Sequence, residues 1–196
     1  MNRFGKILLG LLLLGVIGLI SIVRIVPADA PGDSSRDTEP AAADDVVVAP
    51  TGLAIPVAGV RAADLTDTFG DARGEERRHG ALDIMAPAGR PVIAAAGGTV
   101  EKLFTSEAGG LTVYVRSPDR RFSYYYAHLR DYAADLREGI YVPRGRRLGS
   151  VGSTGNASPD GPHLHFAIFA KPPDAAWHEG RPIDPYRLLA GQAPAR

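Results

Sequence analysis

Residues 162–169 read PHLHFAIF, and the segment has the alternation of a β-strand with one buried face. Successive side chains of a strand point to opposite faces, so Leu164, Phe166 and Ile168 form one apolar face. His163 and His165 then share the other face, where two imidazoles can serve one site. The segment predicts a sheet that is buried on one side and carries histidines on the other.

Short apolar segments separated by turn residues surround this strand. The 23 glycines and 16 prolines lie between those segments, which favours a β-rich domain with many turns. One short helix is expected at Asp131–Glu138, with Gly139 as its stop signal. The expected strands are Pro91–Ala95, Gly98–Phe104, Leu111–Ser117, Phe122–Ala127, Arg147–Val151 and His163–Phe169.

A second pair of possible ligands lies upstream, in RRHGALDIMAP. His79 and Asp83 are four residues apart. This spacing places both side chains on the same face of a strand, and on nearly the same face of a helix. By itself this pair also fits a surface ion pair. The chain has no cysteine, so a metal would be held by histidines and carboxylates. Two histidines and one carboxylate match catalytic zinc, which takes three protein ligands and leaves a position for water.

The other histidines have different surroundings. His163 would lie beside such a metal, where a neutral imidazole could accept a proton from water. His128, in YYYAHL, is a second candidate for that chemistry, or else a strand-end histidine bonded to a turn. His178 has no partner at ligand spacing and is interpreted as loop surface. The neighbouring Trp177 is interpreted as a packing residue rather than a substrate platform.

The N-terminus has the pattern of a membrane span. Residues 7–23 form an uncharged apolar run that is long enough to span a membrane. Arg3 and Lys6 precede the run, which predicts that these two residues stay in the cytoplasm and that the chain after the run is exported. We interpret residues 1–26 as an uncleaved anchor. The alternative is a signal peptide, since residues 28–30 (ADA) have the small-x-small form of a cleavage site.

The segment that follows the apolar run is compositionally distinct. Residues 27–50 are rich in proline, alanine, serine and acidic side chains, which predicts a flexible linker. The folded domain is expected at 51–190, with 191–196 as a tail. The formal charge of the whole chain is zero, so nothing in it points to nucleic acid as a partner.

Four separated blocks follow one another along the chain: FGDARGEERRHGALDIMAPAGRPVIAAAGGTV, SYYYAHL, VPRGRRLGSVGSTGNASPDGPHLHF and IDPYRLL. In this order they resemble the lysostaphin-like (LytM-domain) zinc metallopeptidases that cleave peptidoglycan peptides. The resemblance runs from about Phe69 to Tyr186. Ala81 departs from it, standing where glycine is usual, and Ala167 stands where glutamate is common.

The resemblance implies a fold and a role for each site residue. The fold would be mainly β: a compact antiparallel sheet of the barrel-sandwich type, with the site in a groove bordered by residues 152–162. One Zn²⁺ per domain would be held by His79, Asp83 and His165. His128 and His163 would activate the water and stabilise the charge of the reaction.

Two functions are compatible with these features. The first is a zinc endopeptidase that cuts peptide bonds in peptidoglycan stems or cross-links, outside the cytoplasmic membrane of a bacterial cell envelope. The second is a non-catalytic module that binds peptidoglycan or activates a partner hydrolase. The family's inactive members usually lack a ligand, whereas this chain keeps all five positions, which favours the enzyme.

Overall fold

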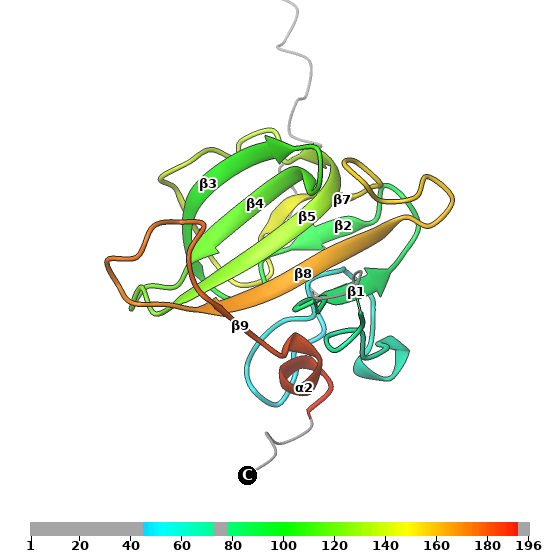
Figure 1. Cartoon of the computed structure of the whole chain (residues 1–196), viewed down its shortest axis with the longest axis horizontal. Helices are drawn as coiled ribbons and strands as arrows, with labels where there is room; N and C mark the ends of the chain where they lie inside the picture. Colours follow the sequence, from blue (N-terminus) through cyan, green and yellow to red (C-terminus); the bar gives the residue numbers. More distant parts are fainter. Residues whose placement is uncertain (1–44, 73–77, 192–196) are drawn as a thin grey trace, which may run out of the picture. The chain divides into compact units, whose positions relative to one another are not determined.

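A computed structural model describes residues 45–72 and 78–191 of the chain. The expected anchor at 1–26 and most of the expected linker lie outside the described residues. Within the described ranges, no helix is long and apolar enough to cross a membrane. The domain formed by these ranges consists mainly of strands, as the turn-rich composition predicts (Figure 1).

All strand pairs of the domain are antiparallel. The main path of the sheet runs β1-β8-β5-β4-β3-β6, β9 pairs with β8, and β7 links β2 to β5. The strands are β1 (Leu82–Met85), β2 (Pro91–Ile93), β3 (Gly98–Ser106), β4 (Gly110–Arg116), β5 (Phe122–Tyr132), β6 (Tyr141–Val142), β7 (Arg147–Val151), β8 (His163–Ala170) and β9 (Arg181–Ile183). The helices are the 3-10 turn η3 (Ala62–Asp64) and α2 (Pro185–Leu189).

Strand β8 has the two faces that its sequence predicts. Leu164, Phe166 and Ile168 are 0%, 0% and 2% exposed and belong to the hydrophobic core. The histidines lie on the opposite face. In the register with β1, His165 is directly opposite Asp83, so the pairing of two strands far apart in sequence brings an imidazole to a carboxylate.

Strand β5 lies at the centre of the sheet. It pairs with β4 on one side and β8 on the other, and its last residues turn away to pair with β7. A register shift between β4 and β5 places one extra residue in β5 near His128, which is a β-bulge. This long strand therefore connects the main path of the sheet with the β2–β7 pair.

The expected helix at Asp131–Glu138 is wrong. Asp131 and Tyr132 are the end of β5, opposite Ser150 and Gly149 of β7, and the following residues form turns. The Ala133 amide donates to the Leu148 carbonyl, and both side chains are buried. Pairing with β7 and burial in the core thus override the local helix propensity of this segment.

The folded region begins earlier than the expected boundary at residue 51. The Ile55 amide donates to the Val47 carbonyl, and the Gly59 amide donates to the Asp45 carbonyl. Ala49 is 6% exposed. Residues 45–50 therefore belong to the domain, because the β-branched run at 46–48 supplies apolar surface that the preceding composition lacks.

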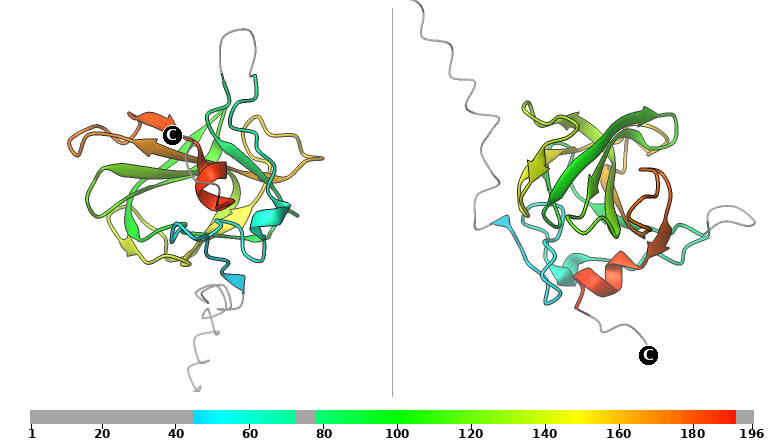
Figure 2. Two further views of the ribbon diagram at one scale, coloured as in Figure 1. Left: turned by 90° about the horizontal axis from the view of Figure 1, so that it is seen from below. Right: turned by 90° about the vertical axis from the view of Figure 1, so that its left-hand side faces the viewer.

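The two ends of the described domain lie side by side. The Thr51 hydroxyl donates to the Leu188 carbonyl of α2, and Figure 2 shows this helix next to the cyan N-terminal segment. Asp184 caps α2 by accepting from the Tyr186 amide, and Leu189 is fully buried. The closing IDPYRLL block thus packs against the start of the fold.

Candidate active site

Three side chains expected to bind metal meet beside β1 and β8. His79 Nε2 lies 3.0 Å from Asp83 Oδ1 and 3.0 Å from His165 Nδ1. His165 Nδ1 also lies 3.0 Å from Asp83 Oδ1. The three atoms thus form a nearly equilateral triangle, and all three residues are partly buried.

The triangle is close in size to the face of a zinc coordination tetrahedron. Zinc bound to nitrogen or oxygen at about 2.0–2.1 Å places adjacent ligand atoms about 3.3 Å apart. A donor set of two imidazoles and one carboxylate suits zinc. These residues therefore fit the metal with only a small outward adjustment.

Thr68 holds two of these residues in place. His79 Nδ1 lies 2.9 Å from the Thr68 carbonyl, to which it donates, and this leaves Nε2 as the atom that faces Asp83. The Thr68 hydroxyl accepts from the Asp83 amide at 2.9 Å. Thr68 lies just before the first block of the resemblance, and the sequence analysis did not identify it.

The electrostatics of the cluster favour a charged Asp83 carboxylate and a neutral His165 imidazole. Burial acts to raise the pKa of Asp83, but hydrogen bonds from His165 and His79 outweigh it and bring the pKa well below its ordinary value. Burial lowers the pKa of His165, although Asp83 opposes this. An ionised carboxylate and neutral imidazoles are the protonation states that bind a cation.

His163 lies beside the ligand cluster. Its Nδ1 donates to the Gly161 carbonyl at 2.8 Å, and its Nε2 points toward the cluster, 3.8 Å from Asp83 Oδ1. His163 and His165 share a face of β8, as predicted. The structure thus brings His163 to the edge of the cluster rather than into the triangle.

His128 reaches the same cluster from the bulge in β5. Its φ is +60°, in the left-handed region that non-glycine residues seldom adopt. The ring lies 5.0 Å from that of His163 and 5.6 Å from that of His165 between centroids. The bulge therefore turns onto the site a side chain that a regular strand would direct elsewhere.

Thr154 fixes the orientation of His128. Its carbonyl accepts from His128 Nδ1 at 2.8 Å, which leaves Nε2 available. The Thr154 hydroxyl accepts from the Leu111 amide at 3.0 Å and donates to the Leu129 carbonyl at 2.7 Å. Thr154 was not singled out from the sequence, although it lies in the segment expected to border the groove.

A cleft of about 530 Å³ opens over the cluster. As expected, the 152–162 segment borders it, through Asn156, Ala157 and Ser158. His178 is exposed on the β8–β9 loop and does not line the cleft. Its other lining residues are Arg78, His79, Ala108, Gly109, Tyr125, Ala127, His128, His163 and His165.

Known proteins resemble this chain in sequence. An L-Ala–D-Glu endopeptidase of Bacillus subtilis is 34% identical over 129 residues, which are 62% of this chain and 38% of that protein. The peptidoglycan DD-endopeptidase ShyC of Vibrio cholerae is 34% identical over 93 residues, which are 47% of this chain and 20% of that protein. The matched region is thus well under half of either relative.

The fold also matches solved structures. The catalytic domain of lysostaphin from Staphylococcus simulans aligns with a TM-score of 0.54 at 26% identity. The alignment covers 65% of this chain and 94% of that domain. A family model, that of peptidase family M23, matches residues 77–185 and so includes all four histidines of the cluster and Asp83. The chain therefore belongs to peptidase family M23.

Proposed function

We propose that this chain is a zinc metalloendopeptidase that hydrolyses peptide bonds in peptidoglycan stems or cross-links. One observation carries the proposal: the domain brings a ligand triangle and two further histidines with inward-facing Nε2 atoms to one open cleft. His79, Asp83 and His165 would hold the metal. When bound, zinc would supply Lewis acidity to the scissile carbonyl and to the attacking water.

The two remaining histidines would move the protons. His163 and His128 each donate from Nδ1 to a main-chain carbonyl, so each presents an Nε2 lone pair to the cleft. His163 is the nearer to Asp83 and would take the proton of the attacking water. Once protonated, an imidazole can donate from Nε2 to the leaving amine or to the carbonyl oxygen.

Burial prepares His128 for this exchange. It lowers the pKa of His128, and the hydrogen bond to the Thr154 carbonyl opposes this shift only in part. The ring is therefore neutral near pH 7 and releases an acquired proton readily. His163 would thus activate the water, and His128 would stabilise the charge that develops in the reaction.

The choice of peptidoglycan as substrate rests on the relatives. Two of them are named for cutting peptidoglycan or an L-Ala–D-Glu bond. The cleft over the cluster has a volume of about 530 Å³, and the family's members are zinc metallopeptidases. We also propose that residues 1–26 anchor the chain in the cytoplasmic membrane, with the domain in the extracytoplasmic envelope.

The ligand assignment can be tested with Asp83→Ala and His165→Ala. Each variant of the full chain is expected to lose bound zinc and to digest purified peptidoglycan at least about a thousandfold more slowly, because several kcal/mol of transition-state stabilisation disappear. Metal content is measured by mass spectrometry, and products are separated by chromatography.

His178→Ala is the matched control, because it removes an exposed histidine outside the cluster. It should retain zinc and activity. Wild-type digestion by either ligand variant would show that the ligands are assigned wrongly. Bound zinc in the wild-type chain without any cleavage would instead favour a module that binds peptidoglycan or activates a partner hydrolase.

A further inference from the structure

A row of aromatic rings leads away from the candidate metal ligands. The ring centroids of His165 and Tyr125 are 5.9 Å apart, and those of Tyr125 and Tyr114 are 4.6 Å apart. Trp177 contacts Tyr114 at 5.0 Å and Phe104 at 5.3 Å. The row thus runs from His165 through Tyr125 and Tyr114 to Trp177 and Phe104.

The row is continuous with the cleft. Tyr125 lines the cleft, and Tyr114 is directly opposite it in the pairing of β4 with β5. Ala127, two residues along β5, is opposite His165 of β8, so Tyr125 and His165 share one face of the sheet. Phe104 is 41% exposed, so the far end of the row is open to solvent.

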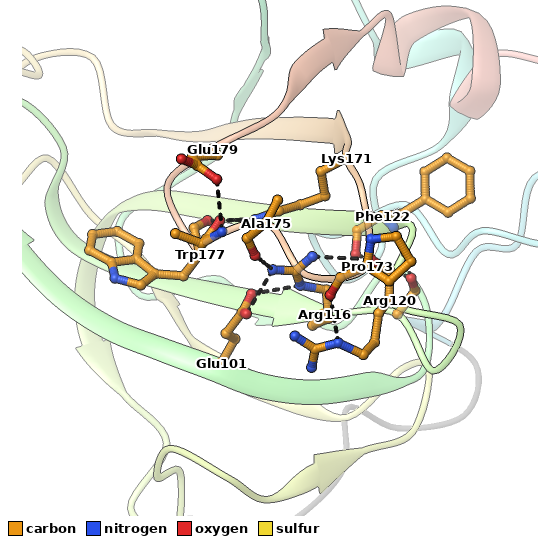
Figure 3. Close-up of polar contacts among 11 residues, drawn as sticks. Glu101, Arg116, Arg120, Phe122, Lys171, Pro173, Ala175, Trp177 and Glu179 are labelled. Atoms are coloured by element: carbon orange, nitrogen blue, oxygen red, sulfur yellow. Dashed lines mark hydrogen bonds and ion pairs between the residues drawn. The ribbon is translucent and has the colours of Figure 1, made fainter.

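Trp177 lies in the β8–β9 loop, residues 171–180. Cationic side chains donate hydrogen bonds to the main-chain carbonyls of this loop. Arg116 Nη2 donates to the Ala175 carbonyl at 2.8 Å, and Arg120 Nε donates to the Pro173 carbonyl at 2.8 Å (Figure 3). Lys171 Nζ donates to the Trp177 carbonyl itself at 3.1 Å. The main chain is thus held at Trp177 and at two residues before it.

This arrangement requires buried charge. Arg116 is 2% exposed and Lys171 is 6% exposed. Glu101 accepts from Arg116 through both carboxylate oxygens at 2.8 Å, which compensates one of the two cations. Burying such groups costs free energy, which a loop that needed only to connect two strands would avoid. The network fixes the position of Trp177 over Tyr114.

We propose that Phe104, Tyr114, Tyr125 and Trp177 form a specificity subsite for the methyl-bearing, alanine-containing part of the substrate peptide. The inference rests on the proposed endopeptidase function and goes beyond it by naming a preference for alanine over glycine. Sequence alone favoured a packing role for Trp177. The structure shows that packing and adds that the row of rings begins at Tyr125, which lines the cleft.

The chemistry of the subsite favours methyl groups. Aromatic faces gain free energy by covering apolar surface, and glycine has no side chain to offer. The nearby cations are already engaged: Arg116 with Glu101, and Lys102 with Glu138 at 2.8 Å. The subsite therefore recognises apolar rather than acidic groups.

The first experiment measures binding without catalysis. Trp177 is the chain's single tryptophan, so its fluorescence reports directly on the subsite. The full chain, kept in detergent and freed of zinc to prevent cleavage, is titrated with tetraalanine in both L and D forms and with tetraglycine. We expect a saturable change with alanine, and an affinity about tenfold above that for tetraglycine, since about two methyl groups are covered. Equal affinities would overturn the proposal.

The second experiment measures cleavage by Trp177→Ala and Trp177→Phe. On peptidoglycan with alanine-containing direct cross-links, Trp177→Ala should raise KM about tenfold with kcat within about twofold, and Trp177→Phe should restore most of the loss. On peptidoglycan with glycine bridges, the KM change should be small. Tyr141→Ala, which removes an aromatic ring that is 61% exposed on β6, is the matched control and should leave both constants unchanged.

The two experiments separate this proposal from the proposed function. If the chain cleaves peptidoglycan while Trp177→Ala leaves KM unchanged, or raises it equally on both substrates, the subsite is wrong and the endopeptidase stands. If the wild-type chain cleaves nothing but tryptophan fluorescence still distinguishes tetraalanine from tetraglycine, the endopeptidase fails and the subsite stands.

Discussion

His128 shows how a single residue can depend on its neighbours for its role. Its left-handed backbone lies in a bulge, and its ring donates from Nδ1 to the Thr154 carbonyl. Thr154 is held in turn by its own hydroxyl, which bonds the main chains of β4 and β5. Proton transfer at His128 should therefore be sensitive to a side chain that does not touch the substrate.

We expect Thr154→Val to lower kcat about tenfold to a hundredfold, because loss of both hydroxyl bonds lets the carbonyl shift away from His128. Thr154→Ser keeps the hydroxyl and should restore most of the activity. Zinc content should not change in either variant, since Thr154 contacts none of the three ligands. Steady-state kinetics with metal analysis checks this, and equal kcat values for the valine and serine variants would exclude the positioning role.

At this scale the sequence indicated which residues meet but not how they are supported. The alternation in β8 placed His163 and His165 on one face, and the spacing of His79 and Asp83 gave the partners. The support from Thr68 and Thr154 arises from hydrogen bonds over 11 to 26 positions along the chain. Common residue types with non-local contacts leave no periodic signal in a single sequence.

At the scale of elements, the close approach of β7 to the end of β5 depends on glycine. Gly149 is opposite Tyr132, and a Cβ atom built on Gly149 would lie 2.2 Å from the Asp131 carbonyl oxygen. The Asp131 side chain accepts a bond from Ser150 at 2.9 Å, so the two strands cannot separate without losing it. This contact joins the β2–β7 pair to the main path of the sheet.

Gly149→Ala should therefore reduce the free energy of unfolding by about 2–3 kcal/mol, because the backbone of β5 or β7 must shift. Chemical denaturation of the full chain gives the value. Gly70→Ala is the control: among the described residues, the group nearest to its added Cβ would be Arg78 Nη1 at 3.8 Å, so it should change stability by less than about 0.5 kcal/mol. Similar losses for both variants would mean that the strands are not closely packed here.

The elements themselves were predictable where the pattern was strong. All six strands expected from apolar alternation are present, and Arg147–Val151 has the expected bounds. The short strands Leu82–Met85, Tyr141–Val142 and Arg181–Ile183 were missed, because two to four residues carry too little periodicity. The segment after Tyr132 was misassigned because its helix-forming residues are held by pairing and burial instead.

At the scale of the whole molecule, the apolar run at 7–23 should decide where the site works. We expect the full chain to sediment with membranes and to be released only by detergent, with the domain accessible to protease from the extracytoplasmic side. A chain lacking residues 7–23 should remain soluble in the cytoplasm. Recovery of a soluble exported form whose N-terminus is Pro31 would instead identify the run as a cleaved signal peptide.

The bulge in β5 also limits how this site could be moved to another protein. Residue identities alone would not reproduce it, since a histidine placed in a regular strand keeps the strand's alternation and faces one side or the other. A transplanted version would need one inserted residue, a left-handed backbone at that position and a carbonyl to receive Nδ1. In a design or a duplication of this sheet, the length of β5 is therefore as much a part of the proposed catalytic site as its histidine.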